Sequence, residues 1–558
     1  MTGARCRARL GVAAAAFVSN ARNPDLRRAQ LSFLGAWTAE WAFTVALGII
    51  AYRDGGATAV GLVGLLRMLP SSLLAPLLSP LADRGRRERV LIIVSVLRGL
   101  ATGAAAVVVG IDGPTSVVYA LAVLSTIAAT LYRPAHSALL PSLCHSGYEL
   151  ASANVVRGLL DAVATLIGPL LAAVLLGLTD VAVVFAVAAG SSLWAAALLV
   201  RLRYDAPPRP SSPSEAALVR AAVEGFLAVS QNRDLGLIMV LAAAQAFTRG
   251  ALTVLTVVVA IDLLATGEPG VGVLTAAIGA GAVLGSLAVS LLVDTTSLGG
   301  WFALGIALYG LPVTLVGVFP NELAAGVILA FVGLGNALID LGGFTLLARL
   351  APDELLARVF GLLESVVAMF IGIGALIASL LIEWVGIRPS LLTIGLLCPV
   401  LALGSLRRLR RMDKTVNHQD RDIALLQAVA MLKPLPLPAI ERLARGLQPL
   451  TVPAGQFVFE QGDVGDHYFV IESGQAVVVG DGVNVATLGP GEGFGEIALL
   501  RRTRRTASVR AIHELHVQAL HSDQFLPLVL GFTPSTVEAG AVVKSALGRF
   551  TPRDNDIE

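Results

Sequence analysis

The chain has 558 residues, of which 55% are hydrophobic and 14% charged, and a formal net charge of +2. Its mean hydropathy of +0.77 excludes an ordinary soluble protein and indicates a polytopic membrane protein. The apolar excess ends near Leu406, and the last 150 or so residues have an ordinary soluble composition. We therefore expect one membrane region and one soluble region.

The N-terminal segment, residues 1–30, carries Arg5, Arg7 and Arg9 before a short apolar run at residues 10–18. This pattern superficially matches a signal peptide. Because the run is short and the first span can target the protein by itself, we expect an amphipathic cytoplasmic helix instead.

Hydrophobic stretches of spanning length then recur between short polar breaks. A proline-rich hydrophilic break at residues 201–214 divides them into two groups of six. The sequence thus predicts twelve spans, near residues 31–52, 58–81, 90–111, 115–140, 150–178, 180–202, 235–265, 271–293, 300–319, 322–349, 355–384 and 387–406.

The two groups of spans show signs of internal repetition. The residues Asn23-Pro24-Asp25-Leu26 before the first span are echoed, 209 positions later, by Asn232-Arg233-Asp234-Leu235 before the seventh. Arginines gather in alternate loops: Arg84, Arg86, Arg87 and Arg89 follow span 2, and two further sets, at 201–209 and 407–411, follow spans 6 and 12. By the positive-inside bias, both termini are predicted to be cytoplasmic, with the protein in the plasma (inner) membrane.

The membrane region resembles the major facilitator superfamily, in motifs that lie mainly in the loops. Asp83-Arg84-Gly85-Arg86-Arg87 resembles the superfamily's signature loop, although Ser79 replaces its leading glycine. The segments 133–143, 149–154 and 168–169 resemble the exporter branch that includes siderophore and drug efflux proteins, and 352–361 is similar to the corresponding loop of the second half. The resemblance implies an all-α membrane domain of two six-helix halves. The loop after span 8 has no basic residues, so we expect weaker conformational locking there.

The signature loop suits a cytoplasmic latch. Arginines at a helix end can pair with Asp83 and with helix C-terminal carbonyls in one conformation and release them in the other. We therefore assign Asp83, Arg84, Arg86 and Arg87 to a latch loop. The alternative is that this positive charge only sets the topology.

Ionisable residues inside spans are costly, so each is a candidate site residue. The 209-residue offset maps Glu40 of span 1 onto Arg249 of span 7, and we expect both to line the transport path. Glu40 or Asp161 is predicted to carry a coupling proton. The spacing of Arg157 and Asp161 predicts a structural ion pair, and Arg98 and Asp262 can snorkel to the membrane surface. The path candidates are Glu40, Arg249, Asp161, Asp340 and Glu364.

The soluble region contains a glycine-rich segment with the character of a phosphate site, residues 489–511. A strand ends in glycines, a short helix opens at Gly495, and a strand resumes at Thr506. Unpaired N–H groups at a helix start attract anions. Glu496 could accept hydrogen bonds from sugar hydroxyls, and Arg505 could hold a phosphate in a bidentate contact.

This segment, FGEIALL followed by RRTASVRA, resembles the phosphate-binding cassette of cyclic nucleotide-binding domains and is most similar to the channel type. The resemblance covers roughly residues 451–520 and implies a β-roll with flanking helices, a helix at residues 534–550 acting as a lid, and cAMP as regulatory ligand, with cGMP as the alternative. The implied binding residues are Gly495, Glu496, Ile497, Ala498, Arg505 and Thr506. The alternative is a β-roll that has lost its ligand.

Several classes are not expected. The sequence contains no Gly-x-x-x-x-Gly-Lys-Ser/Thr loop for ATP-driven pumping, no arrangement resembling a catalytic triad, and scattered cysteines without metal or disulfide spacing. We expect no enzyme, no cofactor, no metal and no nucleic-acid partner. The predicted partners are a cyclic nucleotide, the lipid bilayer, a small-molecule or lipid substrate, and protons.

The sequence therefore predicts a secondary exporter regulated by cAMP. A membrane-tethered cyclic nucleotide receptor and a lipid flippase or scramblase on the same fold are the alternatives. The predicted parts are an N-terminal segment (1–30), two six-helix halves (31–202 and 235–406) joined by a linker (203–234), a basic linker with helices (407–448), a β-roll (449–522) and lid helices (523–558).

Overall fold

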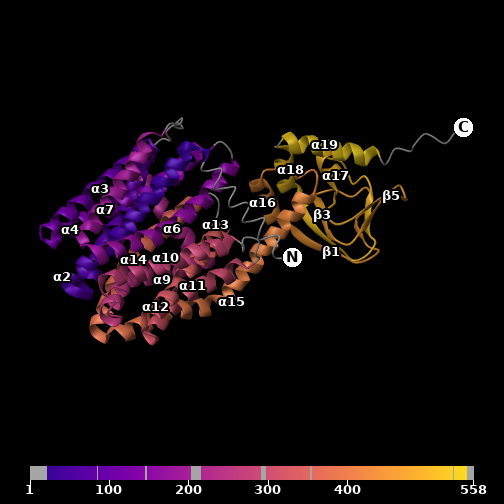
Figure 1. The fold of residues 1–558 in the computed structure, drawn as a ribbon. Helices are drawn as coiled ribbons and strands as arrows, with labels where there is room; N and C mark the ends of the chain where they lie inside the picture. Colours follow the sequence, from indigo (N-terminus) through magenta and orange to yellow (C-terminus); the bar gives the residue numbers. More distant parts are fainter. Residues whose placement is uncertain are drawn as a thin grey trace. The chain divides into compact units, whose positions relative to one another are not determined.

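A computed structural model describes residues 22–84, 86–144, 147–202, 215–290, 297–351, 355–531 and 533–548 (Figure 1). The chain divides into two compact units, Met1–Asp413 and Lys414–Glu558. The regular secondary structure described in the first unit is helical, and the second unit contains all the described strands. The expected helix in residues 1–21, the proline-rich stretch at 203–214 and the loops at 291–296 and 352–354 lie outside the described residues.

The helical unit follows the predicted order of spans. Its first half contains α2 (Pro24–Arg84), α3 (Arg87–Gly110), α4 (Thr115–Ala129), α5 (Tyr132–Leu143), α6 (Gly147–Leu178) and α7 (Val181–Val200). A connecting helix, α8 (Glu215–Gln231), precedes the second half. That half contains α9 (Arg233–Val258), η1 (Val259–Leu263), α10 (Gly267–Ser290), α11 (Leu298–Val318), α12 (Glu322–Ile339), η2 (Asp340–Phe344), α13 (Thr345–Leu350), α14 (Leu356–Val385) and α15 (Ile387–Ala428).

Eleven helices of the described residues are long and apolar enough to cross a bilayer. The first, within α2, comprises two helices that meet at Gly55 and Gly56, both with non-helical backbone angles. A straight helix of 61 residues would extend about 90 Å, three times the thickness of the hydrocarbon core. The two parts of α2 are therefore two spans, which gives the predicted twelve, arranged in two halves of six.

The internal repeat is visible in the hydrogen bonds that open each half. The Asn23 side chain accepts from the backbone N–H groups of Asp25 and Leu26 at 3.2 and 3.1 Å. The Asn232 side chain accepts from those of Asp234 and Leu235 at 2.9 and 3.4 Å. The same N-capping geometry thus occurs 209 residues apart, in support of the repeat seen in the sequence.

Small residues let helices of the second half approach at backbone distance. A Cβ atom added to Gly281 of α10 would lie 1.7 Å from the carbonyl oxygen of Ala330 in α12. One added to Gly333 of α12 would lie 1.9 Å from the carbonyl oxygen of Ile278. Close packing of this kind holds helices together in lipid, where the hydrophobic effect between helices is absent.

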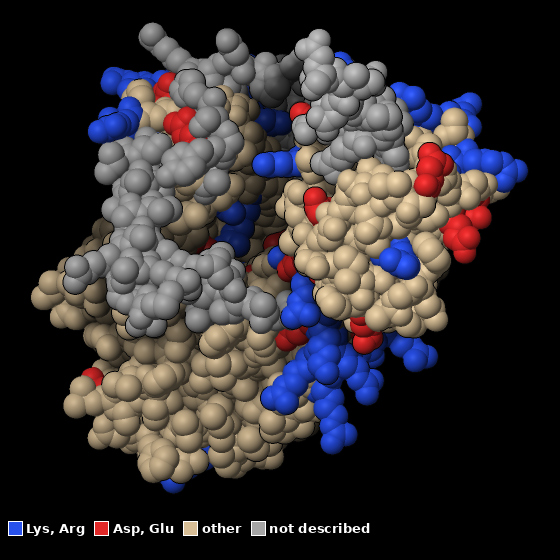
Figure 2. All heavy atoms as spheres, turned by 90° about the vertical axis from the view of Figure 1, so that its right-hand side faces the viewer, with Lys and Arg blue, Asp and Glu red and all other residues tan. Residues whose placement is uncertain are grey.

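Charge is distributed unevenly over the surface. Figure 2 shows wide areas that carry neither Lys or Arg nor Asp or Glu. Large apolar side chains such as Leu323, Trp384 and Leu403 are exposed on the helical unit. An exposed apolar surface on this scale fits contact with lipid.

The C-terminal unit is a β-roll of two four-stranded antiparallel sheets. One sheet has the order β1 (Gln448–Val452), β8 (Leu515–His521), β3 (His467–Ser473), β6 (Gly493–Phe494). The other has the order β2 (Phe457–Phe459), β7 (Ser508–Ala511), β4 (Ala476–Gly480), β5 (Val483–Leu488). Side chains of both sheets form one core, including Phe469, Ile471, Phe494, Val509 and Val517.

Helices cover one side of the roll through a second core. It is formed by the end of α15 together with α16 (Leu437–Arg445), α17 (Glu496–Arg501), α18 (Ser522–Leu530) and α19 (Thr533–Gly548). Tyr468 of β3 stacks on Phe525 of α18 with ring centroids 4.5 Å apart. The predicted lid helix at 534–550 corresponds to α19.

The connection between the units differs from the expected linker. Helix α15 begins in the last span and continues without a break to Ala428. Its basic segment, with Arg407, Arg408, Arg410 and Arg411, is part of this helix. The polar composition after Leu406 reflects a helix leaving the membrane, because helix formation does not require apolar residues.

The close contact of α10 and α12 leads to a stability prediction. We expect Gly281→Ala to lower the melting temperature of the purified protein, since overpacking costs about 1–3 kcal/mol. The matched control is Gly326→Ala in α12, where an added Cβ would have nothing within 4 Å. Equal melting temperatures for the two variants in the same detergent would contradict the packing described here.

Candidate functional sites

The predicted phosphate cassette begins at Gly495, a position whose backbone conformation and surroundings both require glycine. Gly495 precedes α17 in the left-handed region, with φ 92°. A Cβ atom there would lie 2.6 Å from Nη1 of Arg505. A Cβ atom on Gly465 would lie 3.1 Å from the Arg505 guanidinium carbon. The two glycines therefore make the space that the arginine occupies.

The Arg505 side chain is buried and firmly held. Its Nη1 donates to the carbonyl oxygen of Gly495 at 2.9 Å, and its Nη2 to that of His467 at 2.8 Å. The guanidinium carbon lies 4.1 Å from the ring centroid of Phe459 and 5.7 Å from that of Phe469. These contacts orient a cation whose Nε has no hydrogen-bond partner among the described residues.

Glu496 provides a buried carboxylate in the same cassette. It is the first residue of α17 and is 6% exposed. Its Oε2 atom is buried without a hydrogen-bond partner in the described part of the chain. Burial raises the pKa of this carboxyl group above its usual value, against the opposing effect of Arg505.

The charges around Arg505 are mainly acidic. Burial lowers the pKa of its guanidinium, and Asp466, Glu496 and Asp463 act in the opposite direction. The cassette thus offers a buried cation for a phosphate and a buried acceptor for hydroxyl groups. A buried polar atom without a partner is costly, so a ligand that supplies both partners gains affinity.

The other predicted cassette residues have different positions. Ile497 and Ala498 are buried in the first turn of α17, whereas Thr506 is exposed between Arg505 and β7. The sequence reasoning missed the aromatic surface formed by Phe459 and Phe469. Their spacing from Arg505 along the chain gave no signal, because the sheet topology brings them together.

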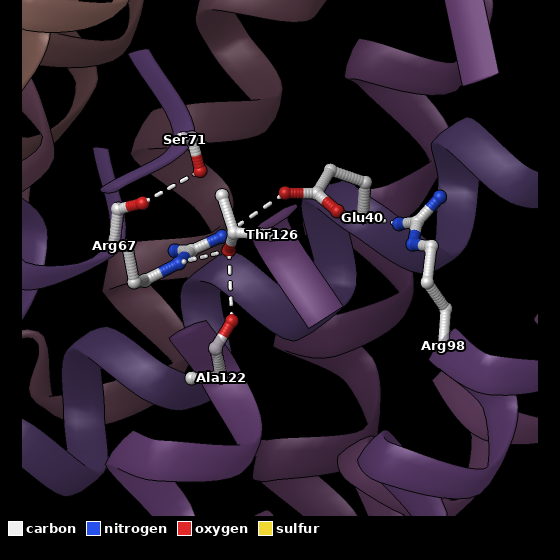
Figure 3. Close-up of polar contacts among 6 residues, drawn as sticks. All are labelled: Glu40, Arg67, Ser71, Arg98, Ala122 and Thr126. Atoms are coloured by element: carbon white, nitrogen blue, oxygen red, sulfur yellow. Dashed lines mark hydrogen bonds and ion pairs between the residues drawn. The ribbon is translucent and has the colours of Figure 1, made fainter. Parts of the chain in front are cut away.

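In the helical unit, Glu40 lies in a polar cluster with the buried side chains of Arg67, Arg98 and Thr126 (Figure 3). Arg67 donates to Glu40 Oε1 at 3.0 Å, and Arg98 donates to Oε2 at 2.5 Å. Arg67 also donates to the Thr126 hydroxyl at 2.9 Å. The cluster joins both parts of α2 to α3 and α4. The expectation that Arg98 snorkels is wrong: it is 3% exposed and paired.

Two arginines from opposite halves stack on tryptophans one turn apart on α2. The guanidinium carbon of Arg133 lies 4.9 Å from the Trp37 ring centroid, and that of Arg249 lies 5.9 Å from the Trp41 ring centroid. Arg133 also pairs with Asp161 at 3.0 Å. Asp161 thus pairs with a residue of α5, and the pair with Arg157 predicted from spacing is not among the ion pairs of the described residues.

The remaining path candidates come from the second half. Asp340 and Glu364 are solvent-accessible in the structure. Asp340 accepts from Asn336 at 3.1 Å and lies within electrostatic range of Asp161, Arg249 and Glu364. The structure therefore brings four of the five path candidates into one charged region and places Glu40 in a separate cluster.

The latch loop is partly described. Arg86 pairs with Glu88 at 2.5 Å, and Arg87 donates to the Ala138 carbonyl oxygen and to the Ser142 hydroxyl at 2.6 and 3.1 Å. The side chains of Asp83 and Arg84 lie outside what the structure describes. Arg87 thus tethers the start of α3 to α5, within the first half.

Polar contacts join the two halves of the helical unit at one end of the spans. Arg53 makes a bidentate pair with Glu268 at 2.6 and 2.7 Å. Tyr52 donates to Asp262 at 2.5 Å. Thr58 donates to Glu383 at 3.0 Å. Each pair joins α2 of the first half to an element of the second half. At the other end, Arg358 of α14 pairs with Glu224 of the connecting helix α8, and Arg408 of α15 pairs with Asp234 of α9.

Taken together, the fold and the cassette define a polytopic helical membrane protein with a buried nucleotide-phosphate site in its soluble unit. The sequence profile of the Major Facilitator Superfamily matches residues 31–295 and 241–459, and that of the cyclic nucleotide-binding domain matches residues 449–530. The chain therefore belongs to the Major Facilitator Superfamily of transporters and carries a C-terminal cyclic nucleotide-binding domain.

Curated relatives share only part of their length with this chain. A cAMP-dependent protein kinase regulatory subunit from Emericella nidulans is 35% identical over 120 residues, 21% of this chain and 29% of the relative. A cyclic nucleotide-gated potassium channel from Rhizobium etli is 33% identical over 150 residues, 27% of this chain and 40% of the relative. The chain thus spans less than half the length of these relatives.

Solved structures give a similarly partial match. The regulatory domain of Toxoplasma gondii PKA, crystallised with cAMP, is 24% identical with a TM-score of 0.22, covering 25% of this chain and 52% of that one. A PKAR CBD2 structure with Sp-2Cl-cAMPS is 24% identical with a TM-score of 0.22, covering 24% of this chain and 92% of that one.

The burial of Glu496 predicts a pH dependence of nucleotide binding. An ionised carboxylate accepts hydrogen bonds from hydroxyl groups more strongly than a protonated carboxyl does, and burial raises the pKa of Glu496 in the free protein. We expect the affinity for cAMP, measured by calorimetry, to fall as pH is lowered through this raised pKa. Glu496→Gln is expected to bind more weakly, by roughly 10-fold, and with a flat pH profile. An unchanged pH profile in that variant would contradict the assignment.

The polar contacts between the halves predict a conformational effect. We expect Arg53→Ala to separate the ends that carry Arg53 and Glu268, because the bidentate pair is lost. Spin labels at Asp112 and Glu322, both exposed near these ends, measure the separation in reconstituted protein. Arg388→Ala, which changes an exposed arginine at the start of α15, is the control. A distance distribution that stays the same in Arg53→Ala would show that this pair does not hold the halves together.

Proposed function

We propose that this protein is a secondary exporter of the plasma (inner) membrane whose transport is regulated by cAMP bound to its C-terminal domain. The observation that carries the proposal is the presence of two buried groups in one cassette, the Glu496 carboxylate and the Arg505 guanidinium, each with a polar atom that has no hydrogen-bond partner among the described residues. A degenerate domain has no reason to retain such costly groups.

The proposed ligand contacts follow from this geometry. Arg505 binds the cyclic phosphate, Glu496 accepts from the ribose hydroxyl, and the amides around Gly495, Ile497 and Ala498 complete the anion site. Thr506 is accessible beside the arginine. The similarity to a cAMP-dependent kinase subunit and to cyclic nucleotide-gated channels supports a cyclic nucleotide, and we favour cAMP over cGMP.

The charged region of the helical unit is the proposed transport path. Charges inside spans are retained where they face water or each other. Arg249, Asp161, Asp340 and Glu364 are accessible or partly so, and come from both halves. We place the coupling proton on Asp340 or Glu364, because Glu40 and Asp161 are ion-paired with arginines and a proton there would break those pairs.

The topology completes the proposal. With both termini cytoplasmic, the contacts of Arg53 and Tyr52 lie at the outer ends of the spans, so the structure corresponds to a state closed to the outside. The signature-loop residues then lie on the cytoplasmic side, as a latch requires, with Asp83 and Arg84 beside Arg86 and Arg87 in sequence. The soluble domain is on the side where cyclic nucleotides are made.

Calorimetry on the full-length protein in lipid nanodiscs tests the sensor. We expect cAMP to bind, and Arg505→Ala to weaken binding by roughly 100-fold or more, because two charge-assisted hydrogen bonds of about 1.5–3 kcal/mol each are lost. Arg501→Ala, an exposed arginine at the end of α17, is the matched control. A wild-type protein that binds no cyclic nucleotide, or an Arg505→Ala variant that binds as well, refutes the sensor.

Substrate identification tests the transporter. Metabolite and lipid profiles of cells that produce the wild-type protein are compared with those of cells that produce Asp340→Asn. Export predicts a compound depleted inside the wild-type cells and retained in the variant. Identical profiles, with both proteins at equal abundance, would favour the membrane-tethered receptor, whereas a lipid as the only changed compound would favour a flippase.

A further inference from the structure

The helical unit ends at Asp413, a residue within helix α15. Asp413 is 7% exposed. Its Oδ1 accepts from the Gly299 amide at 2.6 Å, and its Oδ2 accepts from the Gly300 amide at 3.2 Å and the Ser297 hydroxyl at 3.3 Å. A side chain from the end of the unit thus caps the start of α11.

This capping is unusual because the acceptor lies more than a hundred residues from the helix that it caps. Helix N-termini are normally capped by the residue just before them. Ser297 precedes α11, but its side chain makes no capping bond to the helix. The cap of α11 is therefore supplied by the helix that leads to the nucleotide-binding domain, and a carboxylate there also interacts favourably with the helix dipole.

The neighbouring contacts make this junction tight. Leu409 and Met412 of α15 are buried, and a Cβ atom on Gly299 would lie 2.6 Å from the Leu409 carbonyl oxygen. One turn earlier, Arg408 pairs with Asp234 at the start of α9 at 2.7 Å. The segment from Arg408 to Asp413 is thus fixed to the ends of α9 and α11.

The segment that Asp413 contacts follows the loop after span 8. This loop occupies the position in the second half that the arginine-rich latch loop occupies in the first, and it has no basic residues. The first half holds its corresponding helix start through Arg87. In the second half, the start of α11 is held by Asp413 instead.

Beyond Asp413, the same helix continues into the C-terminal unit. It ends at Ala428, and Leu426 lies in the core shared with Tyr468, Leu499 and Phe525. Leu499 belongs to α17, the helix that Glu496 opens. One continuous helix therefore has one end in the packing around the nucleotide cassette and carries the α11 cap in its middle.

We propose that the Asp413 cap on α11 is the element through which nucleotide binding acts on the transporter. This inference rests on the proposed function and identifies how the nucleotide site regulates transport. A ligand can shift a conformational equilibrium only through interactions that differ between its states. The three hydrogen bonds of Asp413 are such an interaction: they are kept in one position of α15 and lost in another.

Hydrogen exchange on the full-length protein in nanodiscs tests the proposal, with cAMP as the added ligand. In the wild-type protein, cAMP is expected to change the exchange rate at the start of α11, which includes Gly299 and Gly300, by several-fold. Asp413→Ala is expected to exchange faster there without ligand and to show no further change with cAMP. Lys414→Ala, the exposed neighbouring residue on α15, is the control and should behave as wild type.

Affinity measurements provide a second readout, because coupling between two sites is reciprocal. If nucleotide binding alters the cap, removing the cap changes the Kd for cAMP, and we expect a change of about fivefold or more in Asp413→Ala. Asp413→Asn, which keeps the shape but not the charge, serves if the alanine variant does not fold. It is expected to give a smaller change in the same direction.

The outcomes separate this inference from the proposed function. A wild-type protein that does not bind cAMP refutes the sensor itself. Binding that leaves exchange at α11 unchanged, together with an unaltered Kd in both Asp413 variants, refutes the role of the cap and leaves the sensor standing. A cAMP response that persists in Asp413→Ala also refutes it.

Discussion

The buried guanidinium of Arg505 is the constraint on which the nucleotide domain depends. A cation removed from water needs compensating partners, and here they are two backbone carbonyls and two aromatic rings. Gly495 has a left-handed backbone and a Cβ there would lie 2.6 Å from Arg505 Nη1, while a Cβ on Gly465 would crowd the guanidinium carbon at 3.1 Å. The turns, the short helix and the aromatic surface are therefore all arranged around one charge.

The helical unit separates its charges into two kinds. Glu40 is paired with Arg67 and Arg98 in a cluster that joins both parts of α2 to α3 and α4, so we regard it as a structural element (Figure 3). The accessible charges near Asp340 come from both halves. This separation follows the cost of placing charge in a membrane: a buried charge is paired, and an accessible one is available to a substrate or proton.

Local patterns in the sequence predicted much of this structure. Hydropathy gave the spans, and the cassette residues around Glu496 and Arg505 gave the site, because both depend on neighbours in the chain. Tertiary partners could not be predicted in this way. The i, i+4 spacing of Arg157 and Asp161 is compatible with an ion pair, yet Arg133 of α5 is the residue that meets Asp161. The continuity of α15 was missed because its polar half resembles a linker.

The protein joins two units through one helix. In the proposed function, regulation is an equilibrium between transport states that this helix favours or disfavours. A coupling of about 1–3 kcal/mol is enough to change the population of a transport state several-fold. The required interaction energy is small compared with the three hydrogen bonds at Asp413. The proposed control by a cyclic nucleotide therefore needs only the loss or gain of part of these contacts.

The central claim is that nucleotide occupancy changes the conformation of the transporter. It is tested most directly by measuring distances between labels at Asp112 and Glu322 in the full-length protein in liposomes, across a titration with cAMP. The account predicts that the distance populations shift with the same midpoint as binding, and that Arg505→Ala abolishes the shift. Saturated binding with an unchanged distance distribution would contradict it.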